Sequence, residues 1–382
     1  DYGWEATVLA PRNGAYHRDP SLAFPEAKVI RTGTLELSRA GKQLLRTGGD
    51  DVSAATVSGG RRLIKTFMRR HAYFPDAQIG WYAPAVLSAR MHVKQGEYDA
   101  IFSSSFPVTA HLVARTLSER FEIPWVAEFR DPWSAGLPGT SPIRDRAAKL
   151  EAAIGREASA VVTVSPSWAQ RFETAWSRPV SVIRNGHDGL PPARAVAPSD
   201  VITLGYLGTY YPETQDLGAI WRAVRQINDA GGAQIGQIRF IGAANAKLAD
   251  VLAAEDLQAL AHITGFLPHD QALRELSNAA VLLVAGPCDG SGVMKGQVAA
   301  KLSEYLATQR PVIYVGDPDG DAADLVREFP GTFVVATGDV DAARAALIAA
   351  ASTHVDRDVG ELSRHALTGR LASILNGVSS QP

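Results

Sequence analysis

Residues 295–316, KGQVAAKLSEYLATQRPVIYVG, combine a loop, a helix and an apolar strand in one short stretch. Glycine is frequent in and just before the loop, at Gly286, Gly290, Gly292 and Gly296. The apolar run at 311–315 follows the helical pattern directly and predicts a buried strand. Helices that alternate with apolar strands are typical of a parallel sheet, so this stretch predicts an α/β fold.

The predicted helix carries two charged residues on one face. Lys301 and Glu304 are three positions apart, and residues at that spacing are neighbours on a helix surface. An ammonium group beside a helix N-terminus suits a pyrophosphate, and a carboxylate one turn further along suits the two hydroxyls of a ribose. The pair therefore fits the diphosphate and ribose of a nucleotide-sugar. The alternative is a surface helix with an ordinary ion pair.

The rest of the chain alternates strand and helix patterns in two blocks. Apolar runs predict strands of a first domain at 5–10, 99–103, 123–129, 159–165 and 179–183. Strands of a second domain are predicted at 202–207, 237–242, 279–285, 311–315 and 332–336. Helical patterns lie between them, for instance at 107–121, 144–158, 215–229 and 270–277. The proline-rich stretch at 189–200 is the best linker candidate, which gives domains over 1–188 and 201–354.

Length and composition agree with two globular domains. The chain has 382 residues, of which 46% are hydrophobic and 20% charged, so two sizeable cores can form. A net charge of −2 gives no indication of nucleic-acid binding. The single cysteine, Cys288, excludes an internal disulfide and fits a reducing cytoplasm. No apolar run approaches the roughly 18–20 residues that a membrane span needs.

Several motifs resemble those of the family-4 retaining glycosyltransferases of the GT-B fold, and they occur in the family's order. K-L-x-E-Y-L-A-T-x-R-P-V-I at 301–313 resembles the family's donor-site helix, and PWVAEFRDPW at 124–133 resembles its strand ending in F-R-D-P-W. Further segments that resemble the family lie at 103–112, 182–188, 202–209 and 316–325. The resemblance covers nearly the whole chain. It implies two Rossmann-like parallel-sheet domains that face each other across a cleft.

In that fold the ligand lies between the domains, at the C-terminal ends of both sheets. The resemblance implies that the first domain contributes the catalytic residues His111, Asp131 and Arg130. It implies that the nucleotide-sugar donor is bound by Gly208, Thr209, Phe266, Leu267, Lys295, Lys301, Leu302 and Glu304. Structural alternatives stay open for these residues: a plain glycine turn, a hydrophobic strand end, a solvated loop lysine, a buried histidine and a loop-anchoring ion pair.

The resemblance also implies a reaction. A sugar would move from a nucleoside-diphosphate-sugar to a saccharide, lipid-linked or small-molecule acceptor, with retention of anomeric configuration. No pair of carboxylates is defined well enough to argue a covalent intermediate, so we expect a donor phosphate oxygen to take the acceptor proton. Lys301 and Lys295 would stabilise the departing nucleoside diphosphate. We expect no cofactor and no required metal, and we interpret the D-x-D sequence Asp317-Pro-Asp319 as turn chemistry.

The chain departs from the family pattern at three places. Gly296 stands where many members carry the first of two glutamates. A serine stands where many have a histidine directly after the strand at 99–103, and His111 comes later. The first basic residue after Gly208 is Arg222, later than in many members. These differences leave the donor sugar and the exact catalytic contacts open. The sequence alone identifies neither the nucleotide base nor the acceptor nor the oligomeric state.

The segment at 60–71, GRRLIKTFMRRH, mixes basic with apolar residues. On a helix it could lie on an anionic bilayer near a lipid-linked acceptor. The alternatives are a basic, half-buried surface helix and an acceptor phosphate site. We expect a cytoplasmic protein, with peripheral contact at the inner face of the cell membrane as one option.

The two ends of the chain carry further expectations. The sequence begins DYGWEATVLAPR without Met, and the strand at 5–10 resembles the second strand of a Rossmann-like domain. We therefore expect roughly 30–40 residues upstream, about one βα unit. At the other end, a helix over 355–376 is expected to cross back onto the first domain.

Two other functions fit parts of the sequence. A sugar-nucleotide 2-epimerase has a related two-domain fold and would convert a nucleotide-sugar without an acceptor. A non-catalytic sugar-nucleotide-binding subunit would explain Gly296 at the position of the first glutamate. The F-R-D-P-W and K-x-x-E-Y-L-A segments favour transfer over both.

Overall fold

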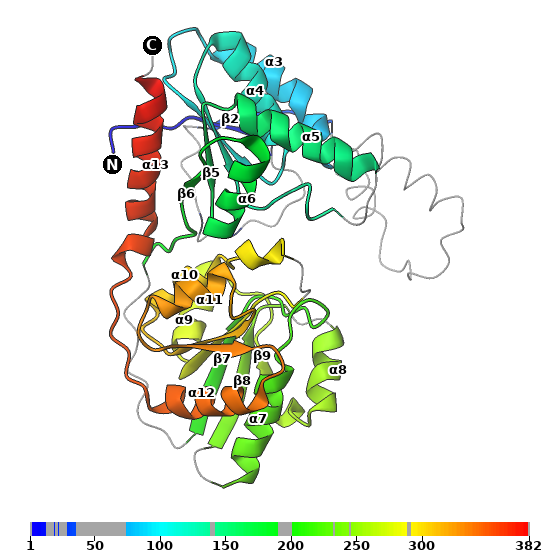
Figure 1. Cartoon of the computed structure of the whole chain (residues 1–382), viewed down its shortest axis with the longest axis vertical. Helices are drawn as coiled ribbons and strands as arrows, with labels where there is room; N and C mark the ends of the chain where they lie inside the picture. The colour runs from blue at the N-terminus through cyan, green and yellow to red at the C-terminus, as the bar shows by residue number, and fades with distance from the viewer. Residues whose placement is uncertain are drawn as a thin grey trace, which may run out of the picture.

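The computed structural model describes residues 2–12, 19, 22, 29–35, 74–137, 142–189, 201–231, 234–243, 246–288 and 292–380. The basic segment at 60–71 and residues 190–200 of the expected linker lie outside these ranges. Two domains stand one above the other in Figure 1, with the N-terminal domain at the top. The predicted parallel α/β fold is confirmed, because every strand pair is parallel in each of the three sheets of the described chain.

The N-terminal domain contains two separate pieces of sheet among the described residues, with strand orders β3-β4-β5-β6 and β1-β2. Its strands are β1 (Val8–Pro11), β2 (Val29–Thr32), β3 (Ile101–Ser105), β4 (Trp125–Phe129), β5 (Ala160–Thr163) and β6 (Ser181–Val182). Its helices are α3 (Tyr82–His92), α4 (Thr109–Phe121), α5 (Pro142–Glu157) and α6 (Pro166–Trp176). The sequence patterns did not predict β2 or α3, and the strand that they placed at 5–10 begins three residues before β1 and ends one residue before it.

The C-terminal domain has one six-stranded sheet in the order β12-β11-β10-β7-β8-β9. Its strands are β7 (Val201–Leu207), β8 (Gln234–Ile241), β9 (Ala261–Ile263), β10 (Val281–Ala285), β11 (Val312–Gly316) and β12 (Thr332–Ala336). Its helices are α7 (Gly218–Asp229), α8 (Ala246–Ala254), α9 (His269–Ser277), α10 (Lys301–Ala307), α11 (Asp321–Arg327) and α12 (Val340–Ser352). Every residue of β10 and β11 is buried, as expected of parallel strands covered by helices on both faces.

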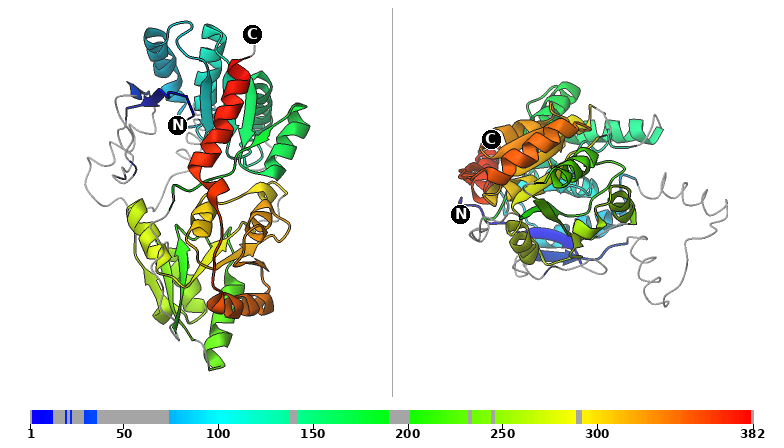
Figure 2. Two further views of the ribbon diagram at one scale, coloured as in Figure 1. Left: turned by 90° about the vertical axis from the view of Figure 1, so that its left-hand side faces the viewer. Right: turned by 90° about the horizontal axis from the view of Figure 1, so that it is seen from below.

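The last helix, α13 (Arg364–Ser379), leaves the C-terminal domain and lies along the N-terminal one, as both Figure 1 and Figure 2 show. Leu367 and Val378 of this helix pack against apolar residues of β4, β5 and the chain after β6, namely Val126, Val162 and Ile183. The start of the chain covers α13 in turn, because Trp4 Nε1 donates a hydrogen bond to Asn376 Oδ1 at 2.9 Å. The two ends of the chain therefore pack together on the N-terminal domain.

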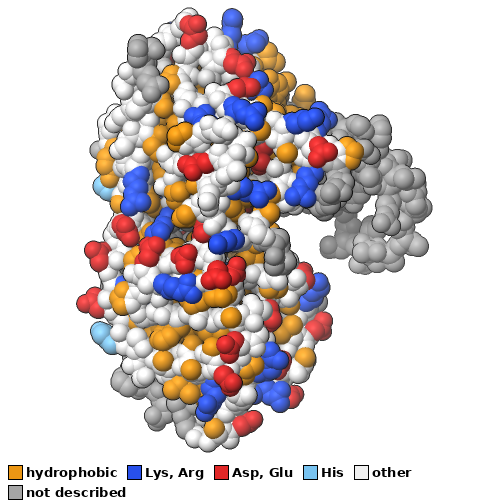
Figure 3. Space-filling model, viewed as in Figure 1, with side chains coloured by type: hydrophobic (Ala, Val, Ile, Leu, Met, Phe, Trp, Pro, Cys, Tyr) orange, Lys and Arg blue, Asp and Glu red, His pale blue; other side chains and the backbone are white. Residues whose placement is uncertain are grey.

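Among the described residues, several polar contacts join the two domains directly, and one of them runs from the His269 N–H of α9 to Asp19 Oδ2 at 2.9 Å. Ser167, at the start of α6, donates from its backbone N–H and its hydroxyl to the two carboxylate oxygens of Asp321, at 2.8 and 2.6 Å. Trp168 Nε1 donates to the carbonyl of Val293 at 2.8 Å. Two further contacts are made by the segment after β6: the Arg184–Glu328 ion pair and the Asn185–Val298 hydrogen bond. On the face seen in Figure 3, charged side chains of both signs gather along this junction.

Candidate functional site

The candidate site is built around the C-terminal end of β7. Its last residue, Leu207, is held by two side chains of α10 that lie one turn apart. The Leu207 N–H donates to Tyr305 Oη at 2.6 Å, and Lys301 Nζ donates to the Leu207 carbonyl at 2.9 Å. These two hydrogen bonds connect α10 to the turn that follows β7.

Lys301 is a half-buried cation without an acidic partner among the described residues. Its ammonium lies 3.9 Å from the centre of the Tyr206 ring, a cation–π geometry. Burial lowers the pKa of the Lys301 ammonium to about 7, because the charged form loses its hydration and the described surroundings provide no carboxylate. An anion placed beside Nζ would restore the charged form, so this position is suited to a negatively charged ligand.

The turn after β7 presents bare backbone next to this lysine. Gly208 has a φ of +97°, which disfavours a side chain, and its N–H donates to the carbonyl of Ile241 at the end of β8. A Cβ on Gly242 would come within 3.0 Å of the Gly208 backbone, so the two turns pack closely. Gly242 also forms a bridge with Gly265 after β9. Thr209 follows in the same turn and is half-buried.

Glu304 lies on the same face of α10 as Lys301, and its side chain is only 12% exposed. Its carboxylate is 3.4 Å from Nε2 of His269, the first residue of α9. Burial raises the pKa of the Glu304 carboxyl, while nearby His269 and Arg364 act in the opposite direction. Sequence reasoning missed His269, although it directly follows the GFLP turn at 265–268. The surface ion pair with Lys301, the alternative for this helix, is not formed.

The N-terminal domain brings its F-R-D-P-W segment to the junction. Arg130 Nη2 donates to Asn185 Oδ1, and Asn185 Nδ2 donates at 3.2 Å to the carbonyl of Val298, just before α10. Burial raises the pKa of the Asp131 carboxyl, and the neighbouring Arg130 guanidinium opposes that shift. Arg130 is thus connected to the loop that leads into Lys301 through Asn185, which sequence reasoning did not single out.

Two residues that were predicted to belong to the site have buried side chains that cannot contact a ligand. His111 is fully buried: its Nδ1 is 2.7 Å from Ser103 Oγ, and its ring packs on Phe129 with centroids 4.6 Å apart. Burial lowers the pKa of His111 to about 3, so this imidazole is neutral and shielded from any sugar. The side chain of Leu302 is also fully buried, within the core of the C-terminal domain. Only its backbone could contact a donor.

The other predicted donor residues lie on loops around the site. Lys295 is exposed on a short 3₁₀ turn before α10. Phe266 is 63% exposed in the turn after β9, whereas the neighbouring Leu267 packs against the domain core. Gly296 lies under the indole of Trp168, and a Cβ there would come within 2.3 Å of the ring. The N-terminal domain thus occupies the space that a side chain at position 296 would need.

The Asp317-Pro-Asp319 sequence forms a turn in which Asp317 Oδ1 accepts a hydrogen bond from the Asp319 N–H at 2.9 Å. This is an Asx turn, as the interpretation of these residues as turn chemistry expects. Within the described ranges, no three histidine, cysteine, aspartate or glutamate side chains are grouped as metal ligands would be. In the same ranges, no helix is long and apolar enough to cross a membrane.

Comparison with known proteins supports the resemblance seen in the sequence. Residues 32–188 match the model of Glycosyltransferase Family 4. No curated protein matches the chain at the level of sequence.

Solved structures share the fold over most of the chain. Sucrose-phosphate synthase from Thermosynechococcus elongatus superposes with a TM-score of 0.58 and 14% identity, covering 98% of this chain and 88% of the other. Anabaena HepE in complex with UDP superposes with a TM-score of 0.52 and 17% identity, covering 84% of this chain and 85% of the other. A mutant of S. aureus TarM with Fondaparinux, alpha-GlcNAc-glycerol and UDP superposes with a TM-score of 0.55 and 8% identity. The match covers 78% of this chain and 59% of the other. At these identities the likeness establishes the GT-B fold.

Proposed function

We propose that this chain, which has the GT-B fold and carries a Glycosyltransferase Family 4 domain at residues 32–188, is a retaining glycosyltransferase that uses a nucleoside-diphosphate-sugar. The observation that carries the proposal is the half-buried ammonium of Lys301, which is held at the end of β7 beside the Gly208 turn. Two proteins of the same fold, HepE and TarM, have structures with UDP, which supports a nucleoside diphosphate as the anion.

The donor would lie against the C-terminal domain. Its diphosphate would face Lys301 and the bare backbone of the Gly208 turn, where no side chain obstructs a close approach. Glu304 would accept hydrogen bonds from the ribose hydroxyls in place of its contact with His269. Lys295 and Phe266 are exposed on the flanking loops and would reach the donor from either side.

The chemistry would then take place at the diphosphate. The acceptor hydroxyl oxygen forms a bond to the anomeric carbon on the face from which the C–O bond to the phosphate breaks. A phosphate oxygen takes the hydroxyl proton, and Lys301 stabilises the negative charge that develops on the leaving diphosphate. A half-buried ammonium is effective here because a local dielectric lower than that of water strengthens its interaction with the phosphate.

The N-terminal domain would position the acceptor. Arg130 and Asp131 lie on the side of the junction opposite Lys301, and Arg130 is connected to the loop before α10 through Asn185. They would orient an acceptor hydroxyl towards the anomeric carbon. His111 has no part in this scheme, because its ring is enclosed in the core.

The test is a transfer assay with UDP-, GDP-, dTDP- and ADP-sugars and a panel of saccharide acceptors, with the product linkage assigned by NMR. We expect one nucleotide class to be used, retention of configuration, and activity that persists in EDTA. Lys301→Met should raise the donor Kd about 10- to 100-fold, since a charge-assisted hydrogen bond contributes about 1.5–3 kcal/mol.

Lys247→Met is the matched control for this variant, because Lys247 is exposed and pairs with Glu213 on the surface of the same domain. Unchanged donor affinity in Lys301→Met would contradict the proposed donor site. Inverted product would contradict the mechanism, and isomerised donor without an acceptor would identify an epimerase. Acceptors presented on anionic liposomes test the lipid-linked alternative, since faster transfer than to soluble acceptors would favour it.

A further inference from the structure

The turn that carries Lys295 is held from the opposite domain. This turn, Met294–Gly296, is a short 3₁₀ helix between β10 and α10. Trp168, in the first turn of α6, donates a hydrogen bond from Nε1 to the carbonyl of Val293 at 2.8 Å. Its indole also lies on Gly296, so closely that a Cβ there would come within 2.3 Å of the ring. One side chain of the N-terminal domain thus contacts the turn at both ends.

Both sides of this contact are firmly packed. The Trp168 side chain is 3% exposed and belongs to the core of the N-terminal domain. On the other side of the turn, the Lys295 carbonyl lies against Gly320, where a Cβ would approach it to 3.3 Å. Gly320 precedes α11, whose first residue, Asp321, accepts the two hydrogen bonds from Ser167. The turn is therefore enclosed between the starts of α6 and α11, which are hydrogen-bonded to each other.

The Lys295 side chain itself is not held in this way. It is exposed, and no carboxylate pairs with its ammonium among the described residues. A lysine side chain is long and flexible, so it loses much rotamer freedom when a ligand fixes it. The protein can reduce this cost only through the backbone, by fixing the point from which the side chain extends. The contacts of the turn do this for Lys295.

We propose that Trp168 is a positioning residue for donor binding: from across the domain junction it fixes the Lys295 turn, and with it the point from which this ammonium reaches the donor diphosphate. The proposal rests on the proposed function, in which Lys295 approaches the donor from a flanking loop. Trp168 is enclosed in the core, so it acts through the turn and does not touch the donor. The donor contacts then all come from the C-terminal domain, while one of them depends on the N-terminal domain for its place.

A double-mutant cycle on donor affinity tests this role. Its variants are Lys295→Met, Trp168→Phe, which keeps an aromatic ring but removes the Nε1 donor, and the two together. The probe is whichever of UDP, GDP, dTDP and ADP the wild type binds most tightly, with Kd measured by calorimetry. We expect Kd to rise about tenfold in Lys295→Met and about fivefold in Trp168→Phe. Because Trp168 acts through Lys295, the double variant should also lose about tenfold, whereas independent effects would multiply to about fiftyfold.

Trp176→Phe is the matched control, because this indole is 4% exposed in the same helix and stacks on Phe172 within the N-terminal domain. It should leave Kd unchanged. Hydrogen exchange of the free protein gives a readout that needs no donor. The Gln297 N–H donates to the Met294 carbonyl at 2.9 Å and closes the turn. It should exchange at least about fivefold faster in Trp168→Phe than in the control.

Unchanged Kd in Trp168→Phe, a fiftyfold loss in the double variant, or unchanged exchange at the turn would each overturn the proposal. Binding that Lys301→Met weakens and Trp168→Phe does not would remove this inference alone and leave the proposed function intact. If none of the four nucleotides binds the wild type, the proposed function fails and this inference fails with it. If near-UV circular dichroism shows that Trp168→Phe is unfolded, Gly296→Ala replaces it with the same expected results, because its Cβ displaces the turn from the indole.

Discussion

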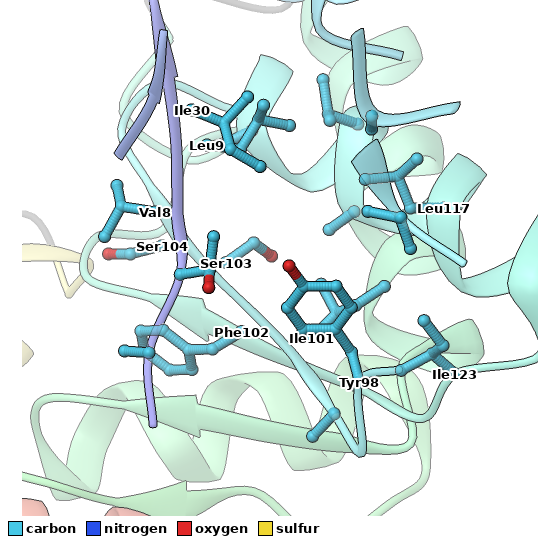
Figure 4. Close-up of a pocket in the computed structure, with 18 of the residues that line it drawn as sticks. Val8, Leu9, Ile30, Tyr98, Ile101, Phe102, Ser103, Ser104, Leu117 and Ile123 are labelled. Carbon is cyan, nitrogen blue, oxygen red and sulfur yellow. The ribbon is translucent and has the colours of Figure 1, made fainter. Parts of the chain in front are cut away.

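The two domains use the same kind of strand but complete their sheets differently. In the C-terminal domain, six strands follow one another without a break, and β10 and β11 are buried along their whole length. In the described part of the N-terminal domain, a cavity bordered by Leu9 and Phe102 separates two strands from the other four (Figure 4), and β1 is half-buried throughout. The comparison shows that an apolar strand contributes its full burial only when both of its edges have neighbours.

The difference bears on the proposed function. Lys301 is fixed by contacts to β7, a central strand of the continuous sheet, so the donor side rests on the better-packed domain. Arg130 follows β4, which lies in the four-stranded piece of sheet of the N-terminal domain. Donor binding should therefore depend on rigid groups of the C-terminal domain, and acceptor positioning on the N-terminal domain and its closure.

The largest expected effect compares one substitution in both sheets. Leu283→Ala removes a fully buried side chain from the centre of β10 and should cost about 2–5 kcal/mol of the free energy of unfolding. Leu9→Ala changes a half-buried residue that already borders a cavity, and it should cost about 1 kcal/mol. Urea unfolding followed by far-UV circular dichroism measures both. Similar losses of stability would mean that β1 is as well packed as β10, and this would contradict the difference between the two sheets.

The second prediction separates the roles of the two domains in the reaction. Arg130→Ala should lower turnover at saturating donor and change the donor Kd by less than about threefold, because the side chain lies across the junction from Lys301. Lys301→Met should instead weaken the donor Kd by about 10- to 100-fold. Calorimetry gives the affinities, and initial rates give the turnover. A donor Kd weakened equally by both variants would show that the first domain also binds the donor.

The third prediction concerns pH. The Lys301 pKa of about 7 lies below its ordinary value, so in the free protein this ammonium loses its proton as pH rises through about 7. A diphosphate favours the charged form, so binding above that pH must take up a proton. The affinity for a nucleotide-sugar should then fall by up to about tenfold per pH unit.

Titration in two buffers of different ionisation enthalpy measures the proton taken up. Lys301→Arg is the matched variant, because its guanidinium stays charged and its affinity should be flat over the same pH range. The stability of the free protein gives an independent check on the direction of the Lys301 pKa shift. Its unfolded state holds this proton up to the ordinary lysine pKa, so the contribution of Lys301 to stability should rise between about pH 7 and that value. Affinity that is independent of pH, with no proton uptake, would contradict the assignment of this lysine.

Local patterns were sufficient for the fold class and for the face of α10. The runs that form β10 and β11 are continuously apolar and end in turns, and this identifies buried parallel strands without any tertiary information. Spacing alone placed Lys301 and Glu304 together. Their partners could not be predicted, because Leu207 and His269 approach α10 from distant parts of the chain.

The error at His111 has a local cause that the sequence does contain. Residues three positions away on either side, Val108 and Ala114, are apolar and buried, so this face of α4 points into the core. Motif resemblance gave the histidine a chemical role, whereas helical periodicity gives it a structural one. The same holds for Leu302, whose neighbours Tyr305 and Leu306 are buried on one face of α10.

The smallest expected effect concerns the contacts that hold the domains together. Ser167→Ala removes the hydroxyl that donates to Asp321, a carboxylate that is only 7% exposed, and it should cost the closed arrangement about 1–2 kcal/mol. Arg184→Ala breaks an ion pair whose two side chains are 24% and 40% exposed, and it should cost at most about 1 kcal/mol. Small-angle X-ray scattering should therefore show a larger radius of gyration for Ser167→Ala than for Arg184→Ala. Donor should partly reverse the increase, because the loop before α10 contacts Asn185 of the first domain. If the exposed ion pair proves the more important, the junction is held by surface charge and not by the half-buried start of α6.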